Sequence, residues 1–196
     1  MTLLTPYRDW LETHDLRFPD EATQQQLSGY LAGLQTWGKR MNLTADRDPS
    51  RLLERHLLDS LMMMRLEREM VDGVLDIGSG GGFPAIPLAI MLPHVRFLLM
   101  ERVARKCAFL KAMGRELGLS NISVVESDLD VVRPPLDAGV AITRAVRVDA
   151  RLFHNLSRLG VPRLLGFSSE HSSYTILSYR LPGERADRYL TMRPVC

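Results

Sequence analysis

The sequence predicts an α/β protein with a mostly parallel, doubly wound sheet and a helical N-terminal extension. From residue 71 onward, short apolar runs alternate with helical patterns, which is typical of strand–helix–strand units joined by right-handed crossovers. Before residue 71, apolar side chains recur at the three- and four-residue spacing of an amphipathic helix. We therefore expect two parts, a helical extension over residues 1–70 and a sheet-containing domain over residues 71–196.

The extension is expected to hold two main helices. In Ala22–Trp37, leucines and a tyrosine fall on one stripe at helical spacing. Pro49 opens a second helix, in which leucines recur with helical period between Leu52 and Leu61. Turn residues fill the stretch 41–49 between these helices, which predicts a connecting loop.

The sheet-containing domain divides into elements at its glycines and prolines. The expected parallel strands are Val74–Ile77, Val95–Met100, Ile122–Val125, Ala138–Ile142 and Arg163–Phe167. The expected helices are Pro84–Leu92, Arg102–Leu117 and Arg151–Leu159. Two further runs, Thr175–Leu181 and Arg188–Arg193, flank Pro182-Gly183, which predicts a terminal antiparallel pair.

Composition and length limit the classes of protein that the chain fits. Of its 196 residues, 45% are hydrophobic and 24% are charged, which is ordinary for a globular protein and excludes wholesale disorder. Its apolar runs are too short to span a bilayer, and its N-terminus lacks a signal-peptide pattern. Two cysteines, Cys107 and Cys196, provide neither a disulfide framework nor metal-ligand spacing. We therefore expect a cytoplasmic protein without a metal site or a membrane partner, and no oligomer is implied.

Positive charge gathers in the last part of the chain. Residues 133–196 hold ten basic side chains, all arginine, against five acidic ones. Arginine suits phosphate contacts through its planar fork, so this excess favours a polyanion partner. A solvated basic surface explains the same excess equally well, and charge alone leaves both interpretations open.

The first strand–helix turn, Asp76–Pro84, is the expected ligand site. In an open parallel sheet, ligands bind beyond the carboxyl ends of the strands, where the strand order reverses. Glycines at Gly78, Gly80 and Gly82 allow positive φ and remove the Cβ atoms that would keep a ligand from the backbone. A dinucleotide fingerprint needs a glycine at its sixth position, which is Phe83 here, so that fingerprint fails.

The observed spacing, acid-x-Gly-x-Gly-x-Gly, is the pattern associated with S-adenosylmethionine. Asp76 is then placed to serve the ammonium group of the methionine moiety, directly or through water. Glu101 ends the second strand at the same edge of the sheet, where a carboxylate accepts hydrogen bonds from both ribose hydroxyls. The two acids and the turn together predict a Rossmann-like class I methyltransferase that uses S-adenosyl-L-methionine.

Two further strand ends provide candidate residues. Leu129 and Asp130 follow the third strand, where an adenine would rest, although acids after a strand also mark a solvated helix start. Arg144 follows Thr143 at the end of the fourth strand, facing the position of the transferred methyl group. An arginine is no base at physiological pH, so it is expected to orient the cofactor or a phosphate.

The chain closely resembles the RsmG/GidB family of bacterial 16S ribosomal RNA methyltransferases that act on guanine N7. The resemblance runs from about Gln26 to Val148. Its specific residues are Trp37 with Asn42–Thr44, Arg55–Ser60, Asp76–Pro87 and Thr143–Ala145. The resemblance implies that small-subunit RNA is the partner, and that the cofactor is contacted by Gly78, Phe83, Leu129, Asp130 and Arg144.

The resemblance also implies a role for His56 and Asp59, which would face the cleft and help to form the RNA-binding surface. Taken by themselves, the two residues lie three apart on one helix face, where a local hydrogen bond explains them as well. No catalytic acid or base is assigned, and His56, Asp59 and Arg144 are positioning candidates. Guanine N7 is an exposed lone pair that needs no deprotonation, so positioning and the exclusion of water suffice.

The sequence departs from the family pattern after residue 167. Family members carry a lysine-glycine turn and a further helix there, whereas this chain moves quickly through Leu165–His171 to its last strands. The later arginines are candidates to compensate in RNA binding: Arg180, Arg185, Arg188 and Arg193. Two alternatives stay open at this point. One is a methyltransferase of the same fold for a small molecule or a protein, and the other is a non-catalytic, ligand-binding α/β protein.

Overall fold

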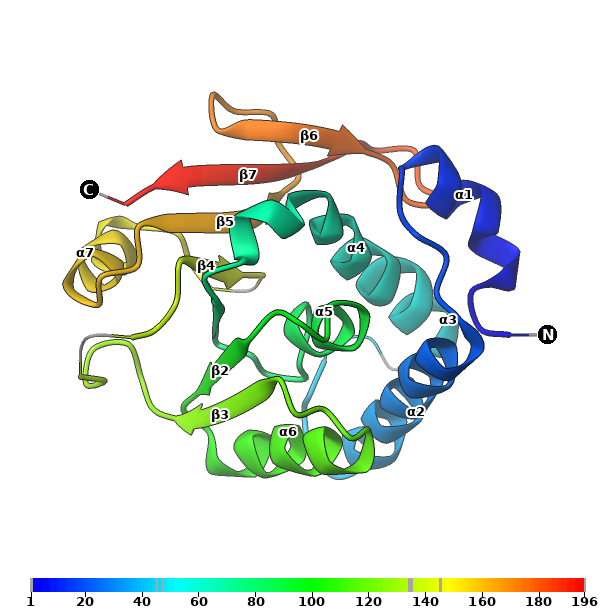
Figure 1. Ribbon diagram of the computed structural model, residues 1–196, viewed down its shortest axis with the longest axis horizontal. Helices are drawn as coiled ribbons and strands as arrows, with labels where there is room; N and C mark the ends of the chain where they lie inside the picture. The colour runs from blue at the N-terminus through cyan, green and yellow to red at the C-terminus, as the bar shows by residue number, and fades with distance from the viewer. Residues whose placement is uncertain (1, 45, 47, 134–135, 145, 196) are drawn as a thin grey trace.

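The fold is built on one seven-stranded sheet, seen in a computed structural model that describes residues 2–44, 46, 48–133, 136–144 and 146–195 (Figure 1). The strand order is β3-β2-β1-β4-β5-β7-β6. The strands are β1 (Val74–Ile77), β2 (Phe97–Glu101), β3 (Ile122–Glu126), β4 (Val140–Thr143), β5 (Arg163–Ser168), β6 (Thr175–Tyr179) and β7 (Arg188–Pro194). The predicted mostly parallel, doubly wound sheet is therefore confirmed.

The strand order reverses at β1. Asp76 in β1 is paired in register with Leu99 of β2 on one side and with Ile142 of β4 on the other, all parallel. The chain runs from β1 to β2 and β3 on one side, then crosses over to β4 and β5 on the other, which opens a crevice at the carboxyl end of β1. The first strand–helix turn therefore lies where the sequence predicts a ligand site.

The last two strands form the predicted antiparallel pair, with a topology that the sequence did not reveal. Strand β7 pairs antiparallel with both β5 and β6, so it lies between them and leaves β6 at the edge (Figure 1). Leu165 of β5 pairs with Met192, and Tyr179 of β6 pairs with Arg188. The hairpin is thus the far end of the same sheet.

Helices cover both faces of the sheet, as Figure 1 shows. Those of the N-terminal region are η1 (Thr5–Tyr7), α1 (Arg8–Thr13), α2 (Glu21–Gly38), α3 (Pro49–Arg51), the π-helical turn η2 (Leu52–Leu57), α4 (Leu58–Leu61) and the 3-10 segment η3 (Met62–Met70). The later helices are α5 (Ala85–Met91), α6 (Ala104–Glu116) and α7 (Ala150–Arg158). The two helices predicted before residue 71 are present as α2 and as the continuous helical stretch from Pro49.

Two hydrophobic cores lie on opposite faces of the sheet. Val74 belongs to the larger core, with residues of α2, α4, α5 and α6, whereas Leu75 and Ile77 belong to the smaller core under α7. This alternation is what a strand buried on both faces requires. The N-terminal helices therefore pack on the sheet and share its larger core.

Two strand starts differ from the sequence-based expectation. Strand β2 begins at Phe97, because the Val95 amide donates to the Leu92 carbonyl and the chain is still turning there. Strand β4 begins at Val140, because the Gly139 amide donates to the Asp72 and Gly73 carbonyls before the ladder starts. Apolar residues in a turn next to a strand look like strand residues when only periodicity is considered.

Candidate functional site

The turn between β1 and α5 is tightly packed around its glycines. Gly82 has φ +94°, and a Cβ there would lie 2.6 Å from the Ile86 side chain and 3.2 Å from the Tyr30 hydroxyl. The Tyr30 hydroxyl donates a 2.7 Å hydrogen bond to the Gly81 carbonyl. Helix α2 of the N-terminal region therefore holds the turn in place, a contact that the sequence did not predict because Tyr30 reads simply as a core residue.

Glu101 braces the same turn from the end of β2. One carboxylate oxygen, Oε2, accepts from the Gly80 amide at 3.0 Å, and the other, Oε1, accepts from the Val103 amide at 2.9 Å. The side chain is almost fully buried. Both oxygens thus already have a backbone donor, which leaves their remaining lone pairs for a ligand. Binding of a ribose by Glu101 stays a prediction.

Asp76 is a buried carboxyl group at the end of β1. It is 1% exposed, and its Oδ2 has no hydrogen-bond partner among the described residues. Burial raises the pKa of Asp76 to about 7, and the negative charge of Glu101 adds to this rise. A buried, unpartnered carboxylate oxygen is costly unless something satisfies it, so the site fits a cationic ligand group such as an ammonium.

A cavity of about 450 Å³ opens at the carboxyl ends of β1, β2 and β3. This volume is in the range of small-molecule and cofactor sites. Of the residues predicted to bind a cofactor, Gly78, Glu101 and Leu129 line it. Arg102 and Lys106 contribute positive charge to its wall. The cavity lies where the strand order reverses, as expected for a ligand site in this class of sheet.

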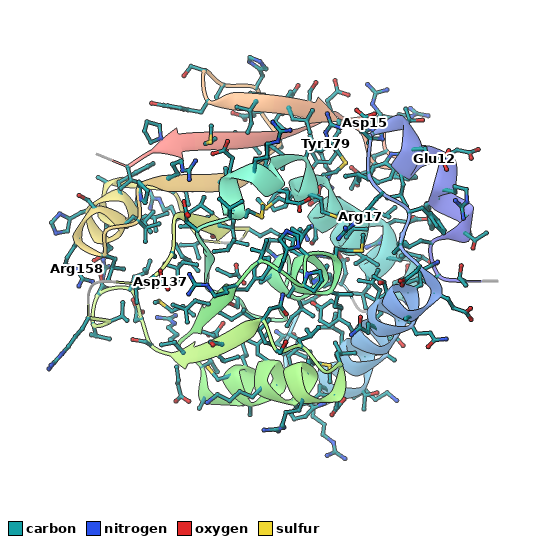
Figure 2. The ribbon with its side chains drawn as sticks, in the orientation of Figure 1. Glu12, Asp15, Arg17, Asp137, Arg158 and Tyr179 are labelled. Carbon is teal, nitrogen blue, oxygen red and sulfur yellow. The ribbon has the colours of Figure 1, made fainter. Side chains whose placement is uncertain are left out.

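Asp130 lies beside this cavity and lines an adjoining one of about 260 Å³. Its carboxylate accepts hydrogen bonds from Arg151 and, at 2.8 Å, from the Asn155 amide. These bonds, with that from Arg151 the strongest influence, hold the pKa of Asp130 below its usual range. Arg158 on α7, labelled in Figure 2, donates to the Leu129 carbonyl and so braces the loop after β3. Contact of Asp130 with a cofactor stays a prediction.

A second group of predicted residues lies around Phe83, on the side of the N-terminal helices. The His56 ring packs on Phe83 with centroids 5.3 Å apart, and its Nε2 is 2.7 Å from Asp46 Oδ2. Burial, followed by the nearby Arg144 charge, lowers the pKa of His56. Asp46 was not predicted as a site residue, because the loop that carries it shows only turn-forming residues.

Asp59 has partners other than His56. Its Oδ1 accepts a 2.5 Å hydrogen bond from the Tyr179 hydroxyl, and its Oδ2 lies 2.8 Å from Arg144 and 3.3 Å from Arg188. Figure 2 shows Tyr179 between the β6–β7 hairpin and the N-terminal helices. Burial, followed by the Asp59 charge, raises the pKa of Tyr179 far above its usual range. Tyr179 was not predicted as a site residue, and Arg188 was expected only among the later arginines as a candidate for RNA binding. Both lie more than a hundred residues beyond Asp59.

Arg144 sits at the end of β4 and reaches the π turn. Besides Asp59, it donates to the Arg55 carbonyl at 2.6 Å and to the His56 carbonyl at 3.2 Å. Its guanidinium carbon lies 5.9 Å from the centre of the Phe83 ring. Burial lowers the pKa of Arg144. Arg144 thus lies near Phe83 of the glycine turn. Contact of Arg144 with a cofactor stays a prediction.

A further cavity of about 310 Å³ lies between α2, the loop that follows it and α3. Its walls include Leu34, Leu43, Thr44 and Asp46, with Lys39 at the edge of the helix. The Leu43 carbonyl would lie 2.9 Å from a Cβ added at Gly81, so the loop leans directly on the glycine turn. This cavity therefore adjoins the His56–Asp46 pair.

Two features are absent from the part of the chain that the structure describes. Within the described ranges, no three histidine, cysteine, aspartate or glutamate side chains come together as a metal site would require. No helix that the structure describes is long and apolar enough to cross a membrane.

The fold is that of S-adenosylmethionine-dependent methyltransferases. A SAM-dependent methyltransferase from Aquifex aeolicus superposes with a TM-score of 0.53 at 17% identity, over 74% of this chain and 93% of that one. A mutant of MtNAS in complex with S-adenosylmethionine superposes with a TM-score of 0.57 at 15% identity, over 90% of this chain and 73% of that one.

The sequence narrows this class to one family. The family model described as rRNA small subunit methyltransferase G (GidB) matches residues 23–163, and the chain belongs to that family. A ribosomal RNA small subunit methyltransferase G from Ectopseudomonas mendocina is 48% identical over 114 residues, or 58% of this chain and 53% of the relative. One from Pseudomonas putida is 41% identical over 148 residues, or 74% and 68%. The chain therefore spans between about half and two thirds of these relatives, and the predicted family resemblance is confirmed.

Proposed function

We propose that the protein methylates guanine N7 in 16S ribosomal RNA, with S-adenosyl-L-methionine as the methyl donor. The observation that carries the proposal is the buried Asp76 carboxylate with its unpartnered oxygen, directly before Ile77 and Gly78, which line the 450 Å³ cavity. Membership of the methyltransferase G family supports ribosomal RNA as the methyl acceptor, since its curated relatives are named as small-subunit RNA methyltransferases. The setting for this chemistry is the cytoplasm, where ribosomal RNA is modified.

Each part of the site then has a task toward the donor. S-adenosyl-L-methionine supplies an electrophilic methyl group on its sulfonium centre. Asp76 receives the ammonium group, and Glu101 receives ribose hydroxyls through the lone pairs that its backbone donors leave free. Gly78, Gly80 and Gly82 let the ligand approach the backbone, while the remaining contacts come from Phe83, Leu129, Asp130 and Arg144.

The acceptor side follows from the chemistry of guanine N7. Because N7 attacks with an exposed lone pair, no side chain has to remove a proton from it. His56 and Arg144 therefore act by holding the base and by excluding water, with His56 fixed against Asp46 and Arg144 paired with the buried Asp59. The N-terminal region, residues 1–70, forms the substrate platform beside the domain of residues 71–196. Arg102 and Lys106 supply positive charge for the RNA backbone.

Methyl transfer to ribosomal RNA tests the proposal. Purified protein is incubated with labelled S-adenosyl-L-methionine and either small subunits or free 16S RNA from cells that lack this protein. We expect label in 16S RNA, at one guanine that reverse transcription locates after cleavage at N7-methylguanine. Calorimetric binding of the donor without any transfer to RNA would refute the acceptor, and failure to bind the donor would refute the whole proposal.

A further inference from the structure

The Asp59 carboxylate is the meeting point of three segments that are far apart in the sequence. It lies on α4, directly after the π turn, and is 1% exposed. Arg144 reaches it from the end of β4, while Tyr179 and Arg188 reach it from the β6–β7 hairpin. The three donors are a hydroxyl and two guanidinium groups, so both carboxylate oxygens are occupied.

The hairpin is tied to the π turn by a second acid as well. Glu184, between β6 and β7, accepts from Arg188 at 2.9 Å and from the Arg55 side chain at 3.0 Å. Glu184 therefore fixes Arg188 relative to the turn whose carbonyls hold Arg144. The hydrogen bonds from Arg188 and Arg55 keep the pKa of Glu184 below its usual range, with that from Arg188 as the larger influence.

Arg144 is held through the two terminal nitrogens of its guanidinium group. Its NH1 and NH2 atoms donate to the carbonyls of His56 and Arg55, and NH2 also meets Asp59. The side chain is 17% exposed, and its guanidinium carbon lies 5.9 Å from the centre of the Phe83 ring. A long side chain keeps one geometry only where its charge is fully paired, because ordering its rotamers is costly. The direction of Arg144 thus depends on where Asp59 is held.

We propose that Tyr179 and Arg188 are positioning residues for methyl transfer, because they hold Asp59, which in turn holds Arg144 at the methyl-transfer site. This inference rests on the proposed function for its catalytic consequence. Both residues contact Asp59 rather than line the cavity beyond β1, β2 and β3, so each acts through Asp59 on Arg144. The β6–β7 hairpin is then a part of the active site, although it lies at the opposite end of the sheet from β2 and β3.

A single hydroxyl group provides the test. Tyr179→Phe removes only the donor to Asp59, and Tyr189→Phe makes the same change on β7, where the ring packs on His171 instead. We expect Tyr179→Phe to lower kcat about tenfold, which is the scale of one hydrogen bond to a charged group, with KM for the donor changed less than about twofold. Tyr189→Phe should keep the wild-type kcat, and equal kcat values for the two variants would overturn the inference.

A double-mutant cycle separates positioning from a general weakening of the fold. In an Arg144→Lys background, Tyr179→Phe should have almost no further effect on kcat, because Tyr179 acts through the arginine. A tenfold fall that is undiminished in that background would overturn the inference. At the second positioning residue, Arg188→Lys should recover part of the kcat that Arg188→Gln loses, since lysine keeps the charge without the planar fork.

A readout without catalysis keeps the two proposals distinguishable. In protein with 15N-labelled arginine, the Nε–Hε signal of Arg144 is assigned by its loss in Arg144→Lys. We expect Tyr179→Phe to shift this signal and Tyr189→Phe to leave it in place. An unchanged Arg144 signal in Tyr179→Phe overturns the positioning inference even if the enzyme is active. A wild-type protein that methylates no RNA refutes the proposed function instead.

Discussion

The glycine turn, which includes Phe83, and the Asp59 cluster, whose Arg144 lies near the Phe83 ring, are built in opposite ways. The turn is one continuous segment, Asp76–Pro84, which Glu101 on the next strand and Tyr30 on α2 hold by hydrogen bonds to its backbone. The cluster brings Asp59 together with Arg144, Tyr179 and Arg188 from separate elements. The first is a local arrangement of backbone, and the second is a long-range arrangement of side chains.

This difference decides how each region responds to change. In the turn, the constraint is steric, because positive φ values and close approaches leave no room for a Cβ. In the cluster, the constraint is electrostatic, because a buried charge without its partners carries a large desolvation cost. Substitutions that differ by a methyl group should therefore damage the turn, whereas substitutions that remove charge should damage the cluster.

The largest effect on stability is expected from Asp59→Leu. This change leaves Arg144 and Arg188 without their shared carboxylate, and we expect the free energy of unfolding to fall by about 4 kcal/mol. Asp187→Leu is the matched control, since Asp187 pairs with Arg180 at the exposed surface and should cost less than about 1 kcal/mol. Urea unfolding of both variants measures the difference. An equal fall in the free energy of unfolding for both variants would show that the buried position of Asp59 adds nothing to the stability of its ion pairs.

A methyl group at Gly82 should have the next largest effect. Gly82→Ala combines a strained φ with a 2.6 Å approach to Ile86, and we expect it to lower the free energy of unfolding by about 3 kcal/mol. Gly160 shares the positive φ, at +74°, but a Cβ there meets nothing within 4 Å. Gly160→Ala should therefore cost only about 1 kcal/mol. Thermal and urea unfolding of the two variants measure how much of the stability loss comes from the contact with Ile86. Similar losses in both variants would show that this contact contributes little.

The pH dependence of stability should report on Asp76. Its pKa is about 7 in the folded protein against an ordinary value of 3.8, so the folded state binds a proton more tightly than the unfolded state. Stability is therefore lost as the pH rises from about 4 to about 7, and the free energy of unfolding should fall by about 2 kcal/mol between pH 5.5 and pH 8. Asp76→Asn should remove this fall in the free energy of unfolding between pH 5.5 and pH 8. Parallel slopes in the two proteins would show that Asp76 does not titrate in this range.

The smallest expected effect is at the contact between helix α1 and the hairpin. The Trp10 indole donates a 2.9 Å hydrogen bond to the Arg180 carbonyl. Trp10→Phe keeps an aromatic ring and removes this donor, so we expect a loss of about 1 kcal/mol in urea unfolding. Methyl transfer should stay at the wild-type rate, because the bond does not involve the Asp59 cluster. A large fall in kcat would contradict this prediction and would mean that the contact with α1 also positions the Asp59 cluster.

The sequence was informative wherever function depends on neighbouring residues. Glycine spacing and the acid before it marked the turn, and Glu101 was found because parallel strands end at one edge of a sheet. His56 and Asp59 were expected on one helix face, yet the π turn changes the rotation between them and sends them to Asp46 and to the hairpin. Such partners depend on tertiary packing, which no spacing along the chain encodes.

The position of strand β7 between β5 and β6 sets an order in which the molecule can be completed. Strand β6 pairs with β7, so it joins the rest of the sheet only through the pairing of β7 with β5. Bringing Tyr179 and Arg188 to Asp59 closes a loop of more than a hundred residues, which is entropically unfavourable until the new contacts form. During synthesis, Asp59 is therefore present long before the tyrosine and arginine that secure it. Until residues 175–194 have been made, the Asp59 carboxylate that pairs with Arg144 lacks its contacts with Tyr179 and Arg188.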